Sequence, residues 1–302
     1  MYMDDVNNKI KPTDDFIFKR LFGVEENKDL LISFLNALFD EYDCFQRIID
    51  LEYKNTEITK KNDDNRSCRL DVRAKINDDS YVDIEVQTED TGNLINRSVF
   101  YNSMMMVDSI DEGNKIQNIP RVISILIVKD KLRDDNKFKD YNSPIVITNI
   151  KSEDTKFGDK SEVITDKFNI IFIFLSKLKE GMLNENLENW LKFIDNQNIF
   201  DISDDKILKA NNKLTILRGD QHIKNIYDAE FKYKFNLAMD LSVARKDGIE
   251  QGIEIGKIEG IKEGIKEKSI EIAKNMLKKG YKIKDISELS GLSIKEVENL
   301  KI

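Results

Sequence analysis

Acidic and amide side chains recur at alternate positions in two neighbouring segments of the sequence, residues 70–76 and 81–87. Apolar residues occupy the positions between them, and this period of two predicts half-buried strands, each with a solvated polar face. The intervening sequence, NDDS, is rich in turn-forming residues, so we expect the two strands to form a β-hairpin. The residues on its polar face that could do chemistry are Asp71, Asp83, Glu85 and Gln87.

The register of this hairpin determines how close the carboxylates of Asp71 and Glu85 come. A loop of three residues pairs Asp71 with Glu85, whereas a loop of five pairs it with Gln87 and leaves Glu85 diagonally adjacent. In either register the two Cβ atoms lie roughly 5–8 Å apart. Two carboxylates at this separation can share one hard cation, because Mg²⁺ is typically held by one or two carboxylates together with phosphate oxygens and water.

Such a carboxylate pair suits the hydrolysis of a phosphodiester bond. This reaction needs a polarised phosphate oxygen and an activated water, both of which a divalent cation supplies. Gln87 points the same way as Glu85 and can donate a hydrogen bond to the developing charge. The alternative is that these residues only form a solvated strand face. The chemical interpretation is favoured because residues 81–87 contain no Lys or Arg, and because an N-terminal helix can bring Asp15 and Lys19 alongside.

Patterns of apolar residues place other elements around the hairpin. In the first helix Thr13 or Asp14 can provide the cap, and Gly23 ends it. A nearly continuous apolar run at 121–128 is typical of a central buried strand. The expected elements beside the hairpin are helices at 11–23, 28–39, 94–110 and within 182–244, and strands at 48–58, 121–128, 144–148 and 167–175.

The C-terminal part of the chain has a different pattern. Glycine recurs every fourth residue from Gly248 to Gly264 among Ile, Glu and Lys, which predicts a solvated linker helix. Beyond it, Ser293 and Glu296 form an S-x-x-E capping box in a compact helix–turn–helix-like tail. So short a tail rarely folds without a partner, which could be the core, a second copy of the chain or DNA. The nearly balanced charge of the tail disfavours DNA, and we expect chains to self-associate through these C-terminal helices. The expected division is a core domain at 1–244, a linker helix at 245–268 and a tail at 269–302.

Composition excludes several classes of protein. The net charge of −8 disfavours binding of nucleic acid through bulk charge, so a DNA enzyme would need a local basic groove or bound cations. One histidine and two widely spaced cysteines exclude multi-histidine metal sites and a disulfide framework. The apolar runs are too short to span a membrane, and the acidic start MYMDDVNN is not typical of a signal peptide. We therefore expect a cytoplasmic protein with no membrane partner.

Four motifs occur in order along the first part of the chain: TDDFIFKRLFG, LLISFLNALF, LDVRAKINDDSYVDIEVQ and NRSVFYNSMM. As an ordered set they resemble the PD-(D/E)xK nuclease family transposases, also called recombination-promoting nucleases. The resemblance covers residues 13–128 and extends more loosely through the glycine repeat to the tail GLSIKEVENL. It implies an α/β fold with a restriction-endonuclease-like core, αβββαβ, in which a mixed sheet is flanked by helices and followed by an α-helical C-terminal tail.

The resemblance also implies roles for the hairpin residues. Asp71 stands where the family has its first catalytic acid, and Glu85 and Gln87 form an E-x-Q variant of the (D/E)-x-K motif. Asp71 and Glu85 would therefore hold Mg²⁺ or Mn²⁺. The sequence departs from the wider superfamily because Gln87 replaces the motif lysine, and glutamine cannot stabilise an anion with a full charge. This departure affects the expected rate more than metal binding.

Helical residues outside the hairpin complete the implied site. Asp15 matches the N-terminal acid of the family's D-F-x-F-K signature and is expected to be catalytic; the alternative is an acid favoured there by the helix dipole. Arg97 and Tyr101, four residues apart on one helical face, match a helix that follows the core. We expect Arg97, Lys19 and Tyr101 to contact nucleic acid, with surface packing and a salt bridge as the alternative for Arg97 and Tyr101.

These inferences lead to one functional hypothesis and two alternatives. The hypothesis is a Mg²⁺-dependent DNA endonuclease that acts in DNA recombination or transposition. The first alternative is a catalytically weak or inactive nuclease fold that binds DNA or protein, which the acidic charge and the missing lysine favour. The second is a transcription regulator working through the tail. In its last helix, however, Lys295 and Lys301 are balanced by Glu296 and Glu298, a poor composition for entering a major groove.

Overall fold

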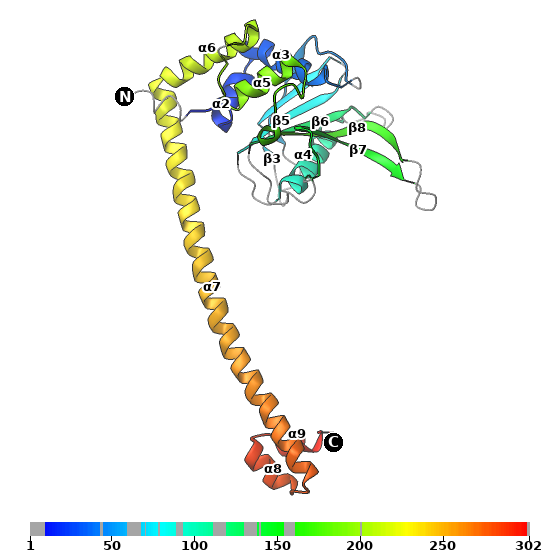
Figure 1. Ribbon diagram of the computed structural model, residues 1–302, viewed down its shortest axis with the longest axis vertical. Helices are drawn as coiled ribbons and strands as arrows, with labels where there is room; N and C mark the ends of the chain where they lie inside the picture. The colour runs from blue at the N-terminus through cyan, green and yellow to red at the C-terminus, as the bar shows by residue number, and fades with distance from the viewer. Residues whose placement is uncertain are drawn as a thin grey trace. The chain divides into compact units, whose positions relative to one another are not determined.

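The computed structural model divides the chain into two compact units, Met1–Tyr227 and Asp228–Ile302, which we treat separately (Figure 1). The structure describes residues 10–42, 45–58, 68–69, 71–77, 79–88, 93–110, 119–129, 138, 140–153, 161–199 and 201–300. The N-terminal sequence MYMDDVNN, Leu70 and Lys301 lie outside these residues. The expected three-part division of the chain stays a prediction.

A mixed six-stranded sheet forms the centre of the first unit (Figure 1). In the order of the sheet, each of the first three strands runs antiparallel to its neighbour, and the fourth and fifth run parallel to the third. The last strand runs antiparallel to the fifth. Their order is β1 (Leu51–Tyr53), β4 (Val72–Ile76), β5 (Tyr81–Gln87), β6 (Val122–Val128), β8 (Ser161–Phe174) and β7 (Ile145–Glu153). This arrangement, flanked by helices, confirms the expected fold class.

The single strand expected at 48–58 is wrong, because the segment forms two short strands. β1 belongs to the main sheet, whereas β2 (Glu57–Ile58) pairs with β3 (Cys68–Arg69) in a separate two-stranded ribbon. The side chain of Asn55 accepts a hydrogen bond from the backbone N–H of Glu57 at 3.0 Å. An asparagine that bonds its own chain two residues on imitates a turn, which ends one strand before the next begins.

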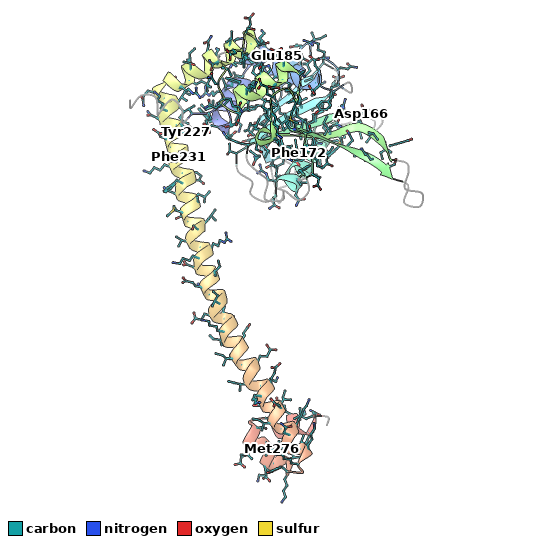
Figure 2. All side chains as sticks on the ribbon, viewed as in Figure 1. Asp166, Phe172, Glu185, Tyr227, Phe231 and Met276 are labelled. Atoms are coloured by element: carbon teal, nitrogen blue, oxygen red, sulfur yellow. The ribbon has the colours of Figure 1, made fainter. Side chains whose placement is uncertain are left out.

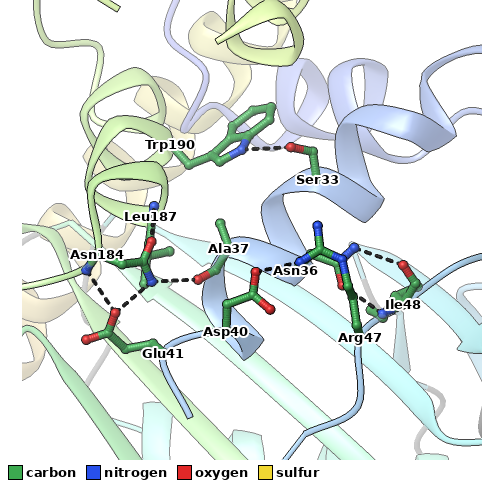
Figure 3. Close-up of polar contacts among 10 residues, drawn as sticks. All are labelled: Ser33, Asn36, Ala37, Asp40, Glu41, Arg47, Ile48, Asn184, Leu187 and Trp190. Carbon is green, nitrogen blue, oxygen red and sulfur yellow. Dashed lines mark hydrogen bonds and ion pairs between the residues drawn. The ribbon is translucent and has the colours of Figure 1, made fainter. Parts of the chain in front are cut away.

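Helices α2 (Asp15–Phe22), α3 (Lys28–Phe39), α5 (Glu185–Ile194) and α6 (Asp205–Gly219) share the largest hydrophobic core with one face of the sheet. Trp190 is fully buried in it, and its indole N–H donates to Ser33 Oγ at 3.2 Å (Figure 3). Asn184 caps α5 by accepting from the N–H of Leu187 at 2.9 Å, and its amide donates to the carbonyl of Ala37 at 3.1 Å (Figure 3). These contacts join α5 to α3.

The N-terminal end of α2 differs from the expected cap. Asp14 occupies the cap position but forms no side-chain hydrogen bond to the helix. Its carboxylate instead accepts from the backbone N–H of Lys11 at 2.7 Å, which closes the turn before the helix. At the other end Gly23 follows the last helical residue, as expected.

Helix α4 (Leu94–Asp108) covers the opposite face of the sheet through buried polar contacts. Asn102 donates to the carbonyl of Asn169 at 3.1 Å and accepts from Ser124 Oγ at 3.1 Å. Arg121 Nε in turn donates to Asn169 Oδ1 at 2.8 Å. Because buried polar groups that bond one another fix a single arrangement, this network holds α4 over β6 and β8.

The expectation of a solvated polar face on the hairpin is wrong. Arg73, Asp83 and Glu85 are only 4%, 1% and 5% exposed. Residues of α4 line a small cavity together with Asp83 and Glu85, so the helix covers this face. The alternation of polar and apolar residues therefore indicates a hairpin whose two faces are both buried, one against apolar groups and the other against polar groups.

Strands β7 and β8 extend beyond their expected ranges of 144–148 and 167–175. Ladder pairing continues from Ile150 with Thr165 to Glu153 with Ser161. The side chains of Ile150 and Val163 are exposed along this extension. Because polar and exposed residues dominate it, a pattern of buried apolar residues could locate only the inner half of each strand.

The second unit has its own small core. The C-terminal turns of α7 (Gln221–Lys278) pack against α8 (Ile283–Ser290) and α9 (Ile294–Glu298). Ser293 and Glu296 form the expected capping box, and Gly280 and Gly291 have φ of 79° and 74°, which favour glycine. The buried residues of this core are Ala273, Ile286, Leu292 and Val297.

The glycine repeat lies within α7, and the isoleucines among its glycines are exposed to solvent, between the labelled residues Phe231 and Met276 of the helix (Figure 2). Ile272 and Leu289, two apolar residues of the tail for which we expect a partner, are also exposed. Within the described residues no helix is long and apolar enough to cross a membrane. Self-association through these helices stays a prediction.

Candidate functional site

The hairpin of β4 and β5 has the shorter of the two expected registers. Its loop has three residues, closed by a hydrogen bond from the N–H of Ile76 to the carbonyl of Ser80 at 2.9 Å. Val72 pairs with Ile84, so the residue before β4, Asp71, lies beside Glu85 in the same register. Asp71 Oδ2 accepts from the backbone N–H of Val86 at 3.2 Å. The chain thereby fixes the first acid next to the second.

Asp71 lies beside two charged residues of helix α2. Lys19 Nζ is 3.0 Å from Asp71 Oδ1 and 2.7 Å from Asp15 Oδ1, so the ammonium bridges the two carboxylates. Burial raises the pKa of Asp71 to about 6, helped by the charge of Asp15 and opposed by the charge of Lys19. For Lys19, burial lowers the pKa, but its hydrogen bond to Asp15 and the charge of Asp71 outweigh that effect, so the pKa is raised.

Glu85 lies between the cluster of α2 and residues of α4. Burial raises the pKa of Glu85 to about 8, the charge of Asp71 adds to this, and the charge of Arg97 opposes it. Arg97 Nη2 lies 3.5 Å from Glu85 Oε2, and its Nη1 donates to Gln87 Oε1 at 3.4 Å. The guanidinium also lies 5.4 Å from the centre of the Tyr101 ring. Arg97 therefore joins the E-x-Q pair to α4.

Asp83 is a third acid of the hairpin, which the sequence analysis placed on the polar face without giving it a catalytic or metal-binding role. It is buried, and within the described part of the chain neither carboxylate oxygen has a hydrogen-bond partner. Burial raises the pKa of Asp83 well above its usual value, and the charges of Glu85 and Asp71 add to this. Its signal in the sequence was its place on the same strand face as Glu85. The side chains that line the adjoining cavity are Asp83, Glu85, Leu94, Arg97, Ser98, Tyr101, Ser124 and Leu126.

The structure thus brings all seven expected site residues into two neighbouring groups. One group comes from α2 and the start of β4, and the other comes from β5 and α4. They meet where Asp71 bonds the N–H of Val86, the residue after Glu85. The first group is Asp15, Lys19 and Asp71, and the second is Glu85, Gln87, Arg97 and Tyr101.

The residues present fit a hard divalent cation. Their donors are carboxylate oxygens, and Glu85 Oε1 is buried with no hydrogen bond from the described residues. A cation would offset the repulsion between carboxylates that raises the pKa of Glu85. Among the described side chains no group of three His, Cys, Asp or Glu could hold a metal. Mg²⁺ keeps waters and takes phosphate oxygens beside one or two carboxylates, so its binding would need no more protein ligands than Asp71 and Glu85.

The structure has a mixed sheet flanked by helices, and its antiparallel hairpin brings two acids together. These features define the class of nuclease-like folds named after the PD-(D/E)XK motif. The family model of PD-(D/E)XK nuclease family transposases matches residues 12–244, and the chain belongs to this family. Comparison with curated proteins and with solved structures found no match.

Proposed function

We propose that the chain is a divalent-cation-dependent DNA endonuclease that hydrolyses phosphodiester bonds in DNA recombination or transposition. The observation that best supports this proposal is the placement of Asp71 beside Glu85, in a site that burial makes poor in water. Burial raises the pKa of both carboxyl groups, to about 6 and about 8. Perturbed acids gathered against a cavity are typical of functional sites.

Mg²⁺ or Mn²⁺ is the cofactor that this site would take. Asp71 and Glu85 would be its protein ligands, and Glu85 Oε1 is a carboxylate oxygen without a hydrogen bond from the described residues. A divalent cation in such a site polarises a phosphate oxygen and activates water for attack. Asp15 acts through Lys19 and not on the metal itself, because its carboxylate holds Lys19 against Asp71.

Arg97 would change partners as the site fills. It now contacts Glu85 and Gln87 and is stacked near Tyr101. Once Glu85 serves as a ligand, the guanidinium can turn to a DNA phosphate, which its planar fork of N–H donors fits. Tyr101 limits how far the guanidinium moves. Local cations of this kind are needed because the whole chain carries a net charge of −8.

The direct test is to incubate the purified chain with supercoiled plasmid in Mg²⁺, in Mn²⁺ and in EDTA. We expect nicked circles with either metal and none in EDTA, because the two acids have no other means of activating water. Nicking that persists in EDTA would contradict the proposal. We propose the cytoplasm as the location of this activity, as expected in the sequence analysis.

One observation favours a second candidate, a nuclease fold that binds DNA or protein without cutting. Gln87 stands in place of the motif lysine, and its side-chain oxygen accepts from Arg97. The plasmid assay separates the two candidates when DNA binding is measured by mobility shift in parallel. A metal-dependent shift without nicking would support the binding module.

A further inference from the structure

Gln87 leaves the hairpin without the ammonium that the (D/E)-x-K motif supplies. We propose that Lys19, on helix α2, provides this ammonium and stabilises the charge that develops on the scissile phosphate. This inference rests on the proposed nuclease function and gives Lys19 a catalytic role in place of the general nucleic-acid contact expected from the sequence. The observation that carries it is the distance of 3.0 Å from Lys19 Nζ to Asp71 Oδ1.

The position of Lys19 puts its ammonium within reach of a phosphate at the acid pair. The backbone N–H of Val86 holds Asp71 next to Glu85, and Lys19 contacts the Asp71 carboxylate. A phosphate bound between the two acids would therefore lie close to the Lys19 ammonium. The lysine side chain is 30% exposed, which leaves a face for a ligand. Because the site is partly desolvated, two charges interact more strongly there than they do in water.

Packing of α2 makes this placement rigid. Ile17, Phe18, Leu21 and Phe22 are all fully buried in the main core. At the end of the helix, Gly23 has no room for a side chain. An added Cβ would lie 2.8 Å from the carbonyl oxygen of Lys19 and 3.3 Å from Val72 Cγ2. The helix therefore approaches the start of β4 closely, where Asp71 lies.

Two further contacts hold Lys19 and its helix. Tyr53 of β1 donates from its hydroxyl to the carbonyl of Phe22 at 2.7 Å, which joins the end of α2 to the sheet. Asp15, one turn before Lys19, lies 2.7 Å from the ammonium and steers it toward the hairpin. A donor fixed before the reaction costs no reorganisation when charge develops.

Arg97 is the other described cation that contacts the acid pair, and its geometry suits a different task. Its contacts to Glu85 and Gln87 are longer, at 3.5 and 3.4 Å, and it comes from the α4 side of the site. Lys19 makes the two shorter contacts, both to carboxylates. We therefore assign the scissile phosphate to Lys19 and a neighbouring phosphate to Arg97.

The test compares Lys19→Met, Lys19→Met/Gln87→Lys and a matched control, Lys28→Met. Lys28 is similarly exposed, at 25%, and also bridges two carboxylates, Glu25 and Asp50, but it lies outside the site. Each protein is measured for single-turnover nicking of supercoiled plasmid in Mn²⁺, for Mn²⁺ affinity without DNA by calorimetry, and for melting temperature.

We expect Lys19→Met to nick about 100-fold more slowly, the effect of removing one fixed donor to developing charge. Its Mn²⁺ affinity should stay the same or rise, because a cation that competes for Asp71 is gone. Lys28→Met should nick at the rate of the unaltered chain. The double variant should recover at least about tenfold, because the ammonium returns to the motif position.

Three results would overturn the inference alone, provided that the unaltered chain nicks DNA. They are full activity in Lys19→Met, a loss of Mn²⁺ affinity that accounts for its slower nicking, and no recovery in the double variant. An unaltered chain that binds Mn²⁺ and does not nick DNA would overturn the proposed function and this inference with it.

Discussion

Asp71 accepts a hydrogen bond from the backbone N–H of Val86 at 3.2 Å, and this bond joins the residue before β4 to the C-terminal end of β5. It places Asp71 beside Glu85, which lines a small cavity together with residues of helix α4. Both carboxyl groups are consequently harder to ionise than free ones. This cost in stability is what a bound cation would offset.

The metal-free protein should lose stability as the pH rises. The folded pKa values of Asp71 and Glu85, about 6 and about 8, exceed unfolded values near 4. Between these values the folded chain holds more protons than the unfolded chain, so the free energy of unfolding falls from about pH 4 to about pH 8. Urea unfolding in EDTA at about pH 5 and about pH 8.5 measures the fall.

The double variant Asp71→Asn/Glu85→Gln isolates this effect from other carboxyl groups. At about pH 8.5 it should be more stable than the unaltered chain by on the order of a few kcal/mol, and at low pH the difference should vanish. A solvated strand face would give only about 0.5 kcal/mol at each position. Equal differences at both pH values would show that the two acids are not perturbed.

Asp83 gives a second stability prediction. Asp83→Asn should raise the free energy of unfolding near neutral pH by about 1 kcal/mol, because it removes a buried carboxyl group that ionises readily in the unfolded chain but is held protonated in the folded one. Glu188 is the matched control. Its side chain also has little exposed surface, but it lies 2.8 Å from Lys192 and accepts from the N–H of Gly181 at 2.8 Å.

Glu188→Gln should therefore lower the free energy of unfolding by about 1 kcal/mol, opposite in sign to Asp83→Asn. Chemical denaturation of the two variants at one pH decides the matter. If both variants destabilise the chain equally, Asp83 has a partner in solution that this account lacks.

Gln87 is expected to help stabilise charge at the site. Gln87→Leu should reduce metal-dependent nicking, since leucine can neither accept from Arg97 nor donate to an anion. Gln87→Lys should keep or raise activity, because it restores the motif ammonium. Initial nicking rates at matched melting temperature test both variants. A leucine variant as active as the parent would make Gln87 only a residue of the strand face.

The C-terminal helices are expected to join chains together. Deletion from Gly248 onward should leave a metal-dependent core but lower the mass measured by light scattering, because it removes the exposed apolar residues of α7 and the tail. An unchanged mass with a loss of DNA affinity would instead make the tail the part that reads DNA. That outcome would favour the regulator hypothesis.

The local sequence pattern located many elements well. The apolar spacing at 28–39 and the alternation at 81–87 coincide with α3 and β5. These predictions succeed because each depends on a period within one segment. The burial of Asp83 could not be predicted in this way, since it depends on α4, which Asn102 anchors to Ser124 and Asn169.

The role of Lys19 also required the fold. In the sequence Lys19 is the lysine of the D-F-x-F-K signature and is expected to contact nucleic acid, but nothing there pairs it with Asp71. Its contact with Asp71 depends on the close approach of Gly23 to Val72, which no local period encodes. A missing motif lysine therefore did not indicate which lysine could replace it.

The central claim is that Asp71 and Glu85 together hold the metal that cleaves DNA. The most direct measurement is Mn²⁺ affinity and plasmid nicking for Asp71→Asn, Glu85→Gln and the control Asp29→Asn, whose carboxylate pairs with Lys206 and Lys209 outside the site. We predict that both site variants lose Mn²⁺ binding and nicking while they stay folded, and that the control keeps both. Wild-type Mn²⁺ affinity and nicking in either site variant would contradict the account.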